Sequence, residues 1–269
     1  MNYARLPDML PDLNAYGVTS EDLRVSAAIG EASRAAQTMM GGRQIHSSLV
    51  TRTFDGDGCG KLYVGDILSI TTLKFDLDGD RTYEETLATT DYHLWPNNPE
   101  SGRGYRRIDI DSYGDYSTFP VGRRCIQIVG KFGMTEIQQA VIIGGAQITG
   151  TLSSASDLTL VTSTAIVNNE IAVGDTLFMG TEEMGPVVSV SGTTVTLQAR
   201  GINGTTAATQ TTIAISLRRY PEDIERAVRA DAARYLWRAS QGMPEQSFTE
   251  TWGAIRGTLL SYMDAAAVI

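Results

Sequence analysis

Acidic residues offer the most obvious candidates for chemistry in this sequence. Residues 76–80 (DLDGD) place carboxylates at alternate positions, as calcium-binding loops do, and residues 55–58 (DGDG) are a shorter instance. The calcium pattern is incomplete, because Arg81 stands where the loop needs glycine and Leu87 stands where it needs a bidentate glutamate. We therefore interpret residues 76–80 as a solvated hairpin turn and predict no metal site.

The histidines and cysteines give little support for catalysis or metal binding. The only histidines are His46 and His93, and neither has a serine, cysteine or carboxylate neighbour in a triad pattern. Cys59 and Cys125 are too few and too far apart for a metal knuckle, so free thiols are expected. Dinucleotide-binding, Walker and zinc-protease motifs are absent from the sequence. We predict no catalytic residue, no cofactor and no enzymatic activity.

The charge balance argues against a conventional DNA-binding protein. The chain has 22 basic against 31 acidic residues, a net charge of −9, so it has no overall positive field for phosphates. Only three of the basic residues are lysines, and a bias toward arginine is typical of interfaces. Four arginines alternate with acidic residues near the C-terminus: Arg226, Arg229, Arg234 and Arg238. We predict that they form salt bridges within or between subunits, and the alternative is that they form a phosphate-binding face.

Apolar residues at helical spacing predict three helices to carry these charges. The first ends at Gly41 and Gly42, the second begins near Pro221, and the third begins with a capping box at residues 247–250. Their apolar stripes are Val25, Ile29, Ala32, Ala36 and Met39; Ile224, Val228, Ala232, Tyr235 and Ala239; and Phe248, Trp252, Ile255, Leu259, Tyr262 and Ala266. Two consecutive amphipathic helices are thus expected to close the chain.

Strand patterns occupy most of the middle of the chain. Runs at 45–54, 67–75, 82–89, 105–110 and 125–129 predict an antiparallel meander. Residues 135–217 differ in composition, with sixteen threonines and a single arginine, and lack His, Cys, Tyr and Trp. Here we predict a small barrel or sandwich, with Glu182 and Glu183 at a solvated hairpin end and strands at 159–162, 176–179, 187–190, 194–197 and 213–217.

These elements together predict an α+β protein with a helical body. The body would comprise residues 1–134 and 218–269, formed by the N-terminal helix, the antiparallel meander and the two C-terminal helices. Residues 135–217 would be an inserted all-β domain, since an insertion whose ends lie close together costs little free energy. We expect folding in the cytosol and no membrane contact, because the N-terminus lacks a secretory pattern and no apolar run approaches about 20 residues.

An ordered set of segments resembles the head-tail connector (adaptor, or head completion) proteins of long-tailed bacteriophages. These segments are residues 67–74 (ILSITTLK), 78–80 (DGD), 90–98 (TDYHLWPNN), 107–108 (RI), 119–124 (FPVGRR), 128–133 (IVGKFG) and 220–224 (YPEDI). Residues 173–184 and 200–208 are similar to parts of phage structural proteins. The set covers most of the predicted body, whereas the long 135–217 insertion departs from the compact members of the family.

The resemblance implies a structural virion protein, assembled in the host cytoplasm. Its copies would form an oligomeric ring, expected to be twelvefold, under the portal protein, joining the capsid to a neighbouring tail or stopper protein. DNA would pass through the ring without sequence-specific binding, as in genome ejection. The resemblance also implies that the helical C-terminal portion faces the portal, so the candidate portal contacts are Phe248, Trp252, Tyr262 and Met263.

Two further hypotheses compete with the adaptor. A carbohydrate- or calcium-binding β module on a helical scaffold is suggested by the Asp-rich turns and by Tyr92 and Trp95. An enzyme that uses paired carboxylates, as glycosidases do, has only the abundance of carboxylates in its favour.

Overall fold

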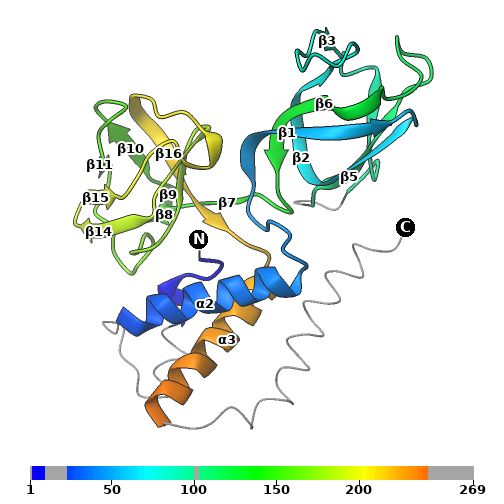
Figure 1. Ribbon diagram of the computed structural model, residues 1–269. Helices are drawn as coiled ribbons and strands as arrows, with labels where there is room; N and C mark the ends of the chain where they lie inside the picture. The colour runs from blue at the N-terminus through cyan, green and yellow to red at the C-terminus, as the bar shows by residue number, and fades with distance from the viewer. Residues whose placement is uncertain (1, 10–22, 100–102, 242–269) are drawn as a thin grey trace. The chain divides into compact units, whose positions relative to one another are not determined.

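The computed structural model describes residues 2–9, 23–99 and 103–241 (Figure 1). Its chain divides into two compact units. We call Arg43–Glu136 the meander unit, and we call Met1–Gly42 together with Ile137–Ile269 the composite unit. The sequence predicted a body in which the helices accompany the meander, with 135–217 inserted. The contacts instead group the helices with the second β region.

The predicted α+β fold with a helical body was wrong. Strands make up 42% of the chain and helices 17%, so the protein is mostly β and is organised in large antiparallel sheets. The reason lies in how the backbone hydrogen bonds are distributed. Strands follow one another from Ser48 to Arg219, interrupted by the short 3-10 helix η1 (Ile202–Gly204), and α-helices flank this region in the part of the chain that the structure describes.

The meander unit is built on one antiparallel sheet with the order β1-β6-β2-β5-β4, and β3 pairs with β2. Its strands are β1 (Ser48–Asp57), β2 (Lys61–Phe75), β3 (Glu85–Thr86), β4 (Tyr92–Trp95), β5 (Tyr105–Ile110) and β6 (Val121–Phe132). The core beneath the sheet includes Phe75, Ile108, Ile126 and Phe132, none of which is exposed. In β2, buried and exposed residues largely alternate, so one face of this strand supplies the core.

One glycine of this sheet is required by its close approach to a neighbouring strand. A Cβ atom at Gly130 in β6 would lie 2.3 Å from the carbonyl oxygen of Ser69 in β2. The register between β2 and β6 shifts on both sides of this point, between Ile67 and Ser69 and between Ile70 and Thr72. The irregular pairing therefore leaves no space for a side chain at Gly130.

The composite unit contains the helices α2 (Leu23–Met39) and α3 (Glu222–Gln241), which pack against each other (Figure 1). The predicted stripe of α2 is buried at Val25, Ile29, Ala32 and Ala36, whereas Met40 rather than Met39 is buried. The helix ends where expected, because Gly41 and Gly42 adopt φ values of +70° and +74°, which favour glycine.

The predicted stripe of α3 is correct for its first half. Ile224, Val228 and Ala232 are buried, but Tyr235 is 38% exposed and its neighbour Leu236 is buried in its place. The third predicted helix, which begins at residue 247, lies outside the described residues.

The composite unit also contains an eight-stranded antiparallel sheet with the order β13-β12-β16-β10-β11-β15-β14, in which β7 also pairs with β16. The strands are β7 (Ile137–Ala140), β10 (Thr149–Leu152), β11 (Thr159–Thr162), β12 (Leu177–Met179), β13 (Glu182–Met184), β14 (Val187–Ser191), β15 (Thr194–Leu197) and β16 (Gln210–Arg219), while β8 (Ile142–Ile143) and β9 (Ala146–Gln147) form a separate hairpin. Strand β16 continues through Tyr220 and Pro221 directly into α3, which joins the sheet covalently to the helices.

Candidate functional site

Aromatic side chains form a row across three strands of the meander unit. Tyr63 of β2, Arg107 of β5 and Trp95 of β4 are direct cross-strand partners, so their side chains share one face of the sheet. The Arg107 guanidinium carbon lies 5.9 Å from the Tyr63 ring centre and 4.9 Å from that of Trp95. Tyr63 is 71% exposed. This aromatic row offers a flat, amphipathic surface of the kind found at protein interfaces.

The arginine of the aromatic row is fixed by a second contact. Arg107 donates from Nε and Nη2 to the two carboxylate oxygens of Asp109, at 2.6 and 2.8 Å. The hydrogen bonds to Asp109 outweigh burial and raise the pKa of Arg107. Tyr92, which suggested a sugar site from the sequence, is only 8% exposed and belongs to the core. His93 faces solvent and contacts Asp111 at 3.0 Å.

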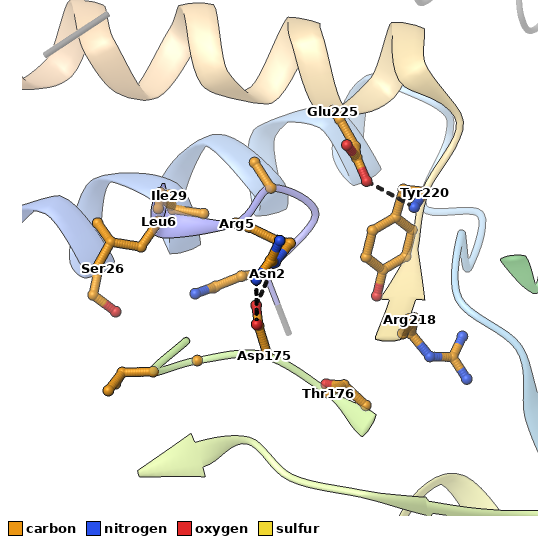
Figure 2. Close-up of a pocket in the computed structure, with 13 residues that line it drawn as sticks. Asn2, Arg5, Leu6, Ser26, Ile29, Asp175, Thr176, Arg218, Tyr220 and Glu225 are labelled. Atoms are coloured by element: carbon orange, nitrogen blue, oxygen red, sulfur yellow. Dashed lines mark hydrogen bonds and ion pairs between the residues drawn. The ribbon is translucent and has the colours of Figure 1, made fainter. Parts of the chain in front are cut away.

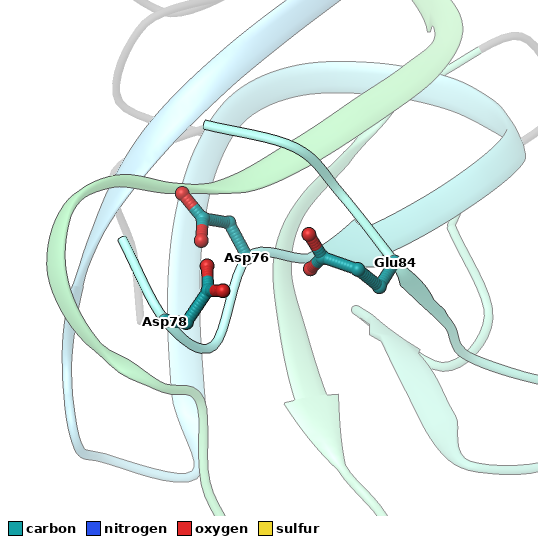
Figure 3. Close-up of side chains that lie close together, drawn as sticks. All are labelled: Asp76, Asp78 and Glu84. Atoms are coloured by element: carbon teal, nitrogen blue, oxygen red, sulfur yellow. The ribbon is translucent and has the colours of Figure 1, made fainter. Parts of the chain in front are cut away.

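The predicted hairpin turn at residues 76–80 brings carboxylates together. Oxygen atoms of Asp76, Asp78 and Glu84 lie within 4.8 Å of one another (Figure 3). Asp76 is buried, and its two oxygens accept hydrogen bonds from the backbone N–H groups of Gly79 and Arg81, at 2.7 and 2.9 Å. These bonds explain the acid at position 76 by the turn itself. The three carboxylates offer the oxygen ligands that calcium prefers. The backbone hydrogen bonds nevertheless give Asp76 a structural role that requires no calcium.

A small cavity in the composite unit lies where the N-terminal segment, α2, the turn before β12 and the end of β16 meet (Figure 2). Its volume is about 70 Å³, far below the roughly 300 Å³ at which sites for drug-sized ligands begin. Arg5 reaches across it and donates to both oxygens of Asp175, at 2.8 and 2.7 Å. Arg5 also donates to the carbonyl oxygens of Asn169 and Glu170. The cavity is thus spanned by an ion pair.

Tyrosine packing closes one side of this cavity. The rings of Tyr3 and Tyr220 meet edge to face with centres 4.9 Å apart, and burial raises the pKa of Tyr3 to about 12. Burial also raises the pKa of Tyr220, whose hydroxyl has no hydrogen-bond partner among the described residues. Glu225 accepts hydrogen bonds from the Tyr220 backbone and from Arg219. The charged groups here are neutralised within the chain, which makes the cavity a structural junction.

Two adjacent glutamates of β13 form buried ion pairs. Glu182 pairs with Arg200, at 2.8 and 2.6 Å, and Glu183 pairs with Arg218, at 2.7 and 2.6 Å. All four side chains are at most 3% exposed. Burial alone would raise the pKa of Glu182, but hydrogen bonds from Arg200 and from the Ala208 backbone outweigh it and lower that pKa.

These pairs correct one sequence expectation. Glu182 and Glu183 were predicted at a solvated hairpin end, and they are buried. The Arg218 guanidinium binds Glu183, and its central carbon lies 5.0 Å from the ring centre of Phe178.

The predicted interface arginines of α3 have different surroundings. Arg226 is exposed and pairs with Asp223 at 2.8 Å. Arg229 donates to the carbonyl oxygen of Asp8, and Arg234 lies 3.8 Å from Asp231, so both contact their own chain. Arg238 belongs to α3, but its side chain is not among those described. The predicted portal contacts lie outside the described residues: Phe248, Trp252, Tyr262 and Met263.

Comparison of the chain with protein-family models, with curated proteins and with solved structures found no match. None of the helices in the described part of the chain combines the length and the apolar character needed to cross a membrane.

Proposed function

We propose that the protein is a head-to-tail adaptor of a long-tailed bacteriophage, whose copies form a ring under the portal, join the capsid to the tail and line the DNA channel. One observation carries the proposal. The connector-like segments from the first part of the chain occupy neighbouring strands of a single sheet, although loops separate them in sequence. Residues 67–74 lie in β2, 107–108 lie in β5, 128–133 overlap β6, and 90–98 contain β4.

The second part of the resemblance also falls on a defined junction. Residues 220–224 begin α3 directly after β16, where the Tyr220 backbone and Arg219 bind Glu225. In the family that the sequence resembles, this segment starts the helical portion that faces the portal. The position of α3 directly after an interior strand of its sheet supports an equivalent part here.

Electrostatics supports a channel that does not hold DNA. A twelvefold ring of chains with a net charge of −9 would carry roughly a hundred negative charges. A channel lined by such charges repels phosphates, so DNA would slide through it without sequence-specific binding. The aromatic row then suits contact with a protein, either the portal or a tail-side partner.

Mass photometry of the purified chain with and without its portal ring tests this proposal. We expect many copies to join one portal ring in a stoichiometric complex. The substitution Tyr63→Ser should weaken a complex that uses the aromatic row, whereas Tyr113→Ser, at a tyrosine that is 97% exposed, is the matched control. A chain that stays alone in the presence of portal would refute the adaptor proposal.

A calcium-binding module is the second candidate, favoured by the approach of Asp76, Asp78 and Glu84. Binding of calcium to the folded state alone would raise the melting temperature, and EDTA would lower it by several degrees. An adaptor should melt at the same temperature in calcium and in EDTA.

A further inference from the structure

A cluster of arginines surrounds one carboxylate in the meander unit. Asp66 lies in β2 where the register with β5 shifts, beside Gly65, whose φ of +77° permits this irregular backbone. Arg43 holds both oxygens of Asp66, with its Nε 2.7 Å from Oδ2. The Nε atom of Arg106 lies 3.8 Å from Oδ1 of the same group, too far for a hydrogen bond. We call Arg43, Arg52 and Arg106 the arginine cluster.

Arg52 completes the cluster from β1. Its guanidinium carbon lies 4.3 Å from the centre of the buried Phe132 ring, and one nitrogen contacts Oε1 of Gln44 at 3.4 Å. Burial lowers the pKa of Arg52, and the charge of Asp66 opposes this effect. Burial, followed by the charge of Arg43, likewise lowers the pKa of Arg106.

The charge balance of the cluster is therefore positive. The guanidinium groups of Arg43 and Arg106 lie beside the single carboxylate of Asp66, which is 10% exposed, and Arg43 already occupies its two oxygens. Neither Arg52 nor Arg106 forms a hydrogen bond to a carboxylate of a described residue. Because the Arg106 side chain is 33% exposed, a further carboxylate can reach it from outside.

The same unit carries a complementary surface, the acidic turn, which we define as residues 76–85. Its carboxylates at Asp78, Asp80, Glu84 and Glu85 are exposed, and Leu77 is 56% exposed beside them. From Asp66, strand β2 continues for about ten residues to the turn, and a strand of this length spans about 30 Å. Within one copy, the turn is therefore too far from Asp66 and its partners Arg43 and Arg106 for these groups to neutralise each other. Two copies placed head to tail can bring them together.

We propose that the arginine cluster binds the acidic turn of a neighbouring copy of this chain, and that this contact forms the head-to-tail interface of the ring. The inference rests on the proposed adaptor function, which supplies the ring. Repetition of one such heterologous contact closes a ring when the rotation between copies is a whole fraction of a turn.

A carboxylate fits this cluster better than the phosphates of DNA. Guanidinium groups are weakly hydrated and bind carboxylates bidentately at partly buried positions, and the pairing of Arg43 with Asp66 is an instance within the cluster itself. The chain carries nine more negative than positive charges, which repel a polyanion but leave carboxylates available to a second copy. A contact with DNA is therefore treated as a competing outcome of the test.

Two charge-reversal variants test the contact. Variant A is Arg52→Glu with Arg106→Glu, and variant B is Asp78→Arg with Glu84→Arg. In each variant alone, like charges face each other at every interface. In an equimolar mixture, the intact turn of A meets the intact cluster of B, and the two reversed surfaces attract each other. The matched control is Arg34→Glu, which reverses an exposed arginine of α2 that belongs to neither proposed surface.

Mass photometry with the portal ring gives the readout. We expect A alone and B alone to lose at least tenfold in the number of copies recruited, and the mixture to recover to within about twofold of the unmodified chain. Arg106→Gln, which only removes a charge, should show an intermediate loss and guards against misfolding of variant A. A mixture as defective as its components, or variant A recruited normally, would overturn the inference while leaving the adaptor proposal intact.

The experiment separates the two proposals. If the portal fails to recruit the unmodified chain, the adaptor proposal fails, and A and B are then mixed without portal and followed by analytical ultracentrifugation. Association of A with B that neither shows alone supports the contact, and the absence of such association overturns it. Binding of a DNA duplex by the unmodified chain and not by A would assign the arginine cluster to phosphate instead.

Discussion

The buried pair of Arg218 and Glu183 provides the sharpest test of how the composite unit is stabilised. The substitution Arg218→Met keeps much of the side-chain volume beside Phe178 but leaves the Glu183 carboxylate buried without its cation, with Asn203 still donating at 2.8 Å. Breaking a buried pair from one side costs about 3–5 kcal/mol. For a unit of this size, each kcal/mol lowers the melting temperature by about 2–4 °C, so we expect a drop of roughly 10 °C.

The matched control is an exposed pair. Arg34 contacts Glu31 with side-chain exposures of 67% and 60%, and Arg34→Met should cost less than about 1 kcal/mol. The double variant Arg218→Met with Glu183→Met removes both charges and should be much less destabilised than the single variant, because a buried pair and its apolar replacement often have similar stability.

Differential scanning calorimetry is the appropriate assay, because the two compact units can unfold separately and give distinct transitions. Only the transition of the composite unit should move. If Arg218→Met costs no more than Arg34→Met, or if the double variant is as unstable as the sum of its single variants, the account of Glu183 as a charge that depends on Arg218 is refuted.

Three further predictions follow from single positions. Gly130→Ala should destabilise the meander unit by about 1–3 kcal/mol in urea unfolding, because its Cβ would lie 2.3 Å from a carbonyl oxygen. Gly30→Ala in α2 should instead stabilise the protein by up to about 1 kcal/mol, because its Cβ would make only ordinary contacts. Asp76→Ala should cost about 1–3 kcal/mol in the same assay by leaving two backbone donors unpaired, and this loss should be equal in calcium and in EDTA. Folding lowers the pKa of Glu182 from its ordinary value of 4.5, so its negative charge stabilises the folded protein at pH values above 4.5. The stability advantage of the unmodified protein over Glu182→Gln should therefore disappear as the pH falls below 4.5. A constant difference between pH 7 and pH 3 would contradict this last prediction.

Local patterns predicted the individual elements well. The predicted strands 105–110, 159–162 and 194–197 have the bounds of β5, β11 and β15, because alternation and flanking turn residues define them. The run 82–89 instead contains only the short β3 (Glu85–Thr86). Its first residues complete the turn, where the Thr82 N–H donates to Asp80, so they cannot join the sheet.

The class of the whole fold was missed because it depends on contacts between distant segments. The helical stripes were correctly placed at Val25 and Ile224, but their existence says nothing about which sheet they accompany. The acids of β13 were misread for a similar reason. Glu182 and Glu183 are polar in sequence and buried in the structure, because their arginine partners lie 18 and 35 positions away.

The candidate sites also differ in whether their residues are neighbours in sequence. The turn at Asp76 was recognisable because its groups are neighbours in sequence. The arginine cluster draws Arg43 from the connection before β1, Arg52 from β1 and Arg106 from β5 toward Asp66 in β2. No linear spacing links these positions, and only the antiparallel pairing of the strands could have revealed the cluster.

The arginine bias of the chain now has a more specific explanation than interfaces in general. Arg5, Arg200 and Arg218 each bind both oxygens of a carboxylate in their own chain, and their exposures show that these pairs lie away from solvent. Such pairs use the planar geometry of arginine to hold distant segments together and leave no charge for a partner. An interface must then use arginines that form no hydrogen bond to a carboxylate of the same copy, a condition that Arg52 and Arg106 fulfil among the described residues.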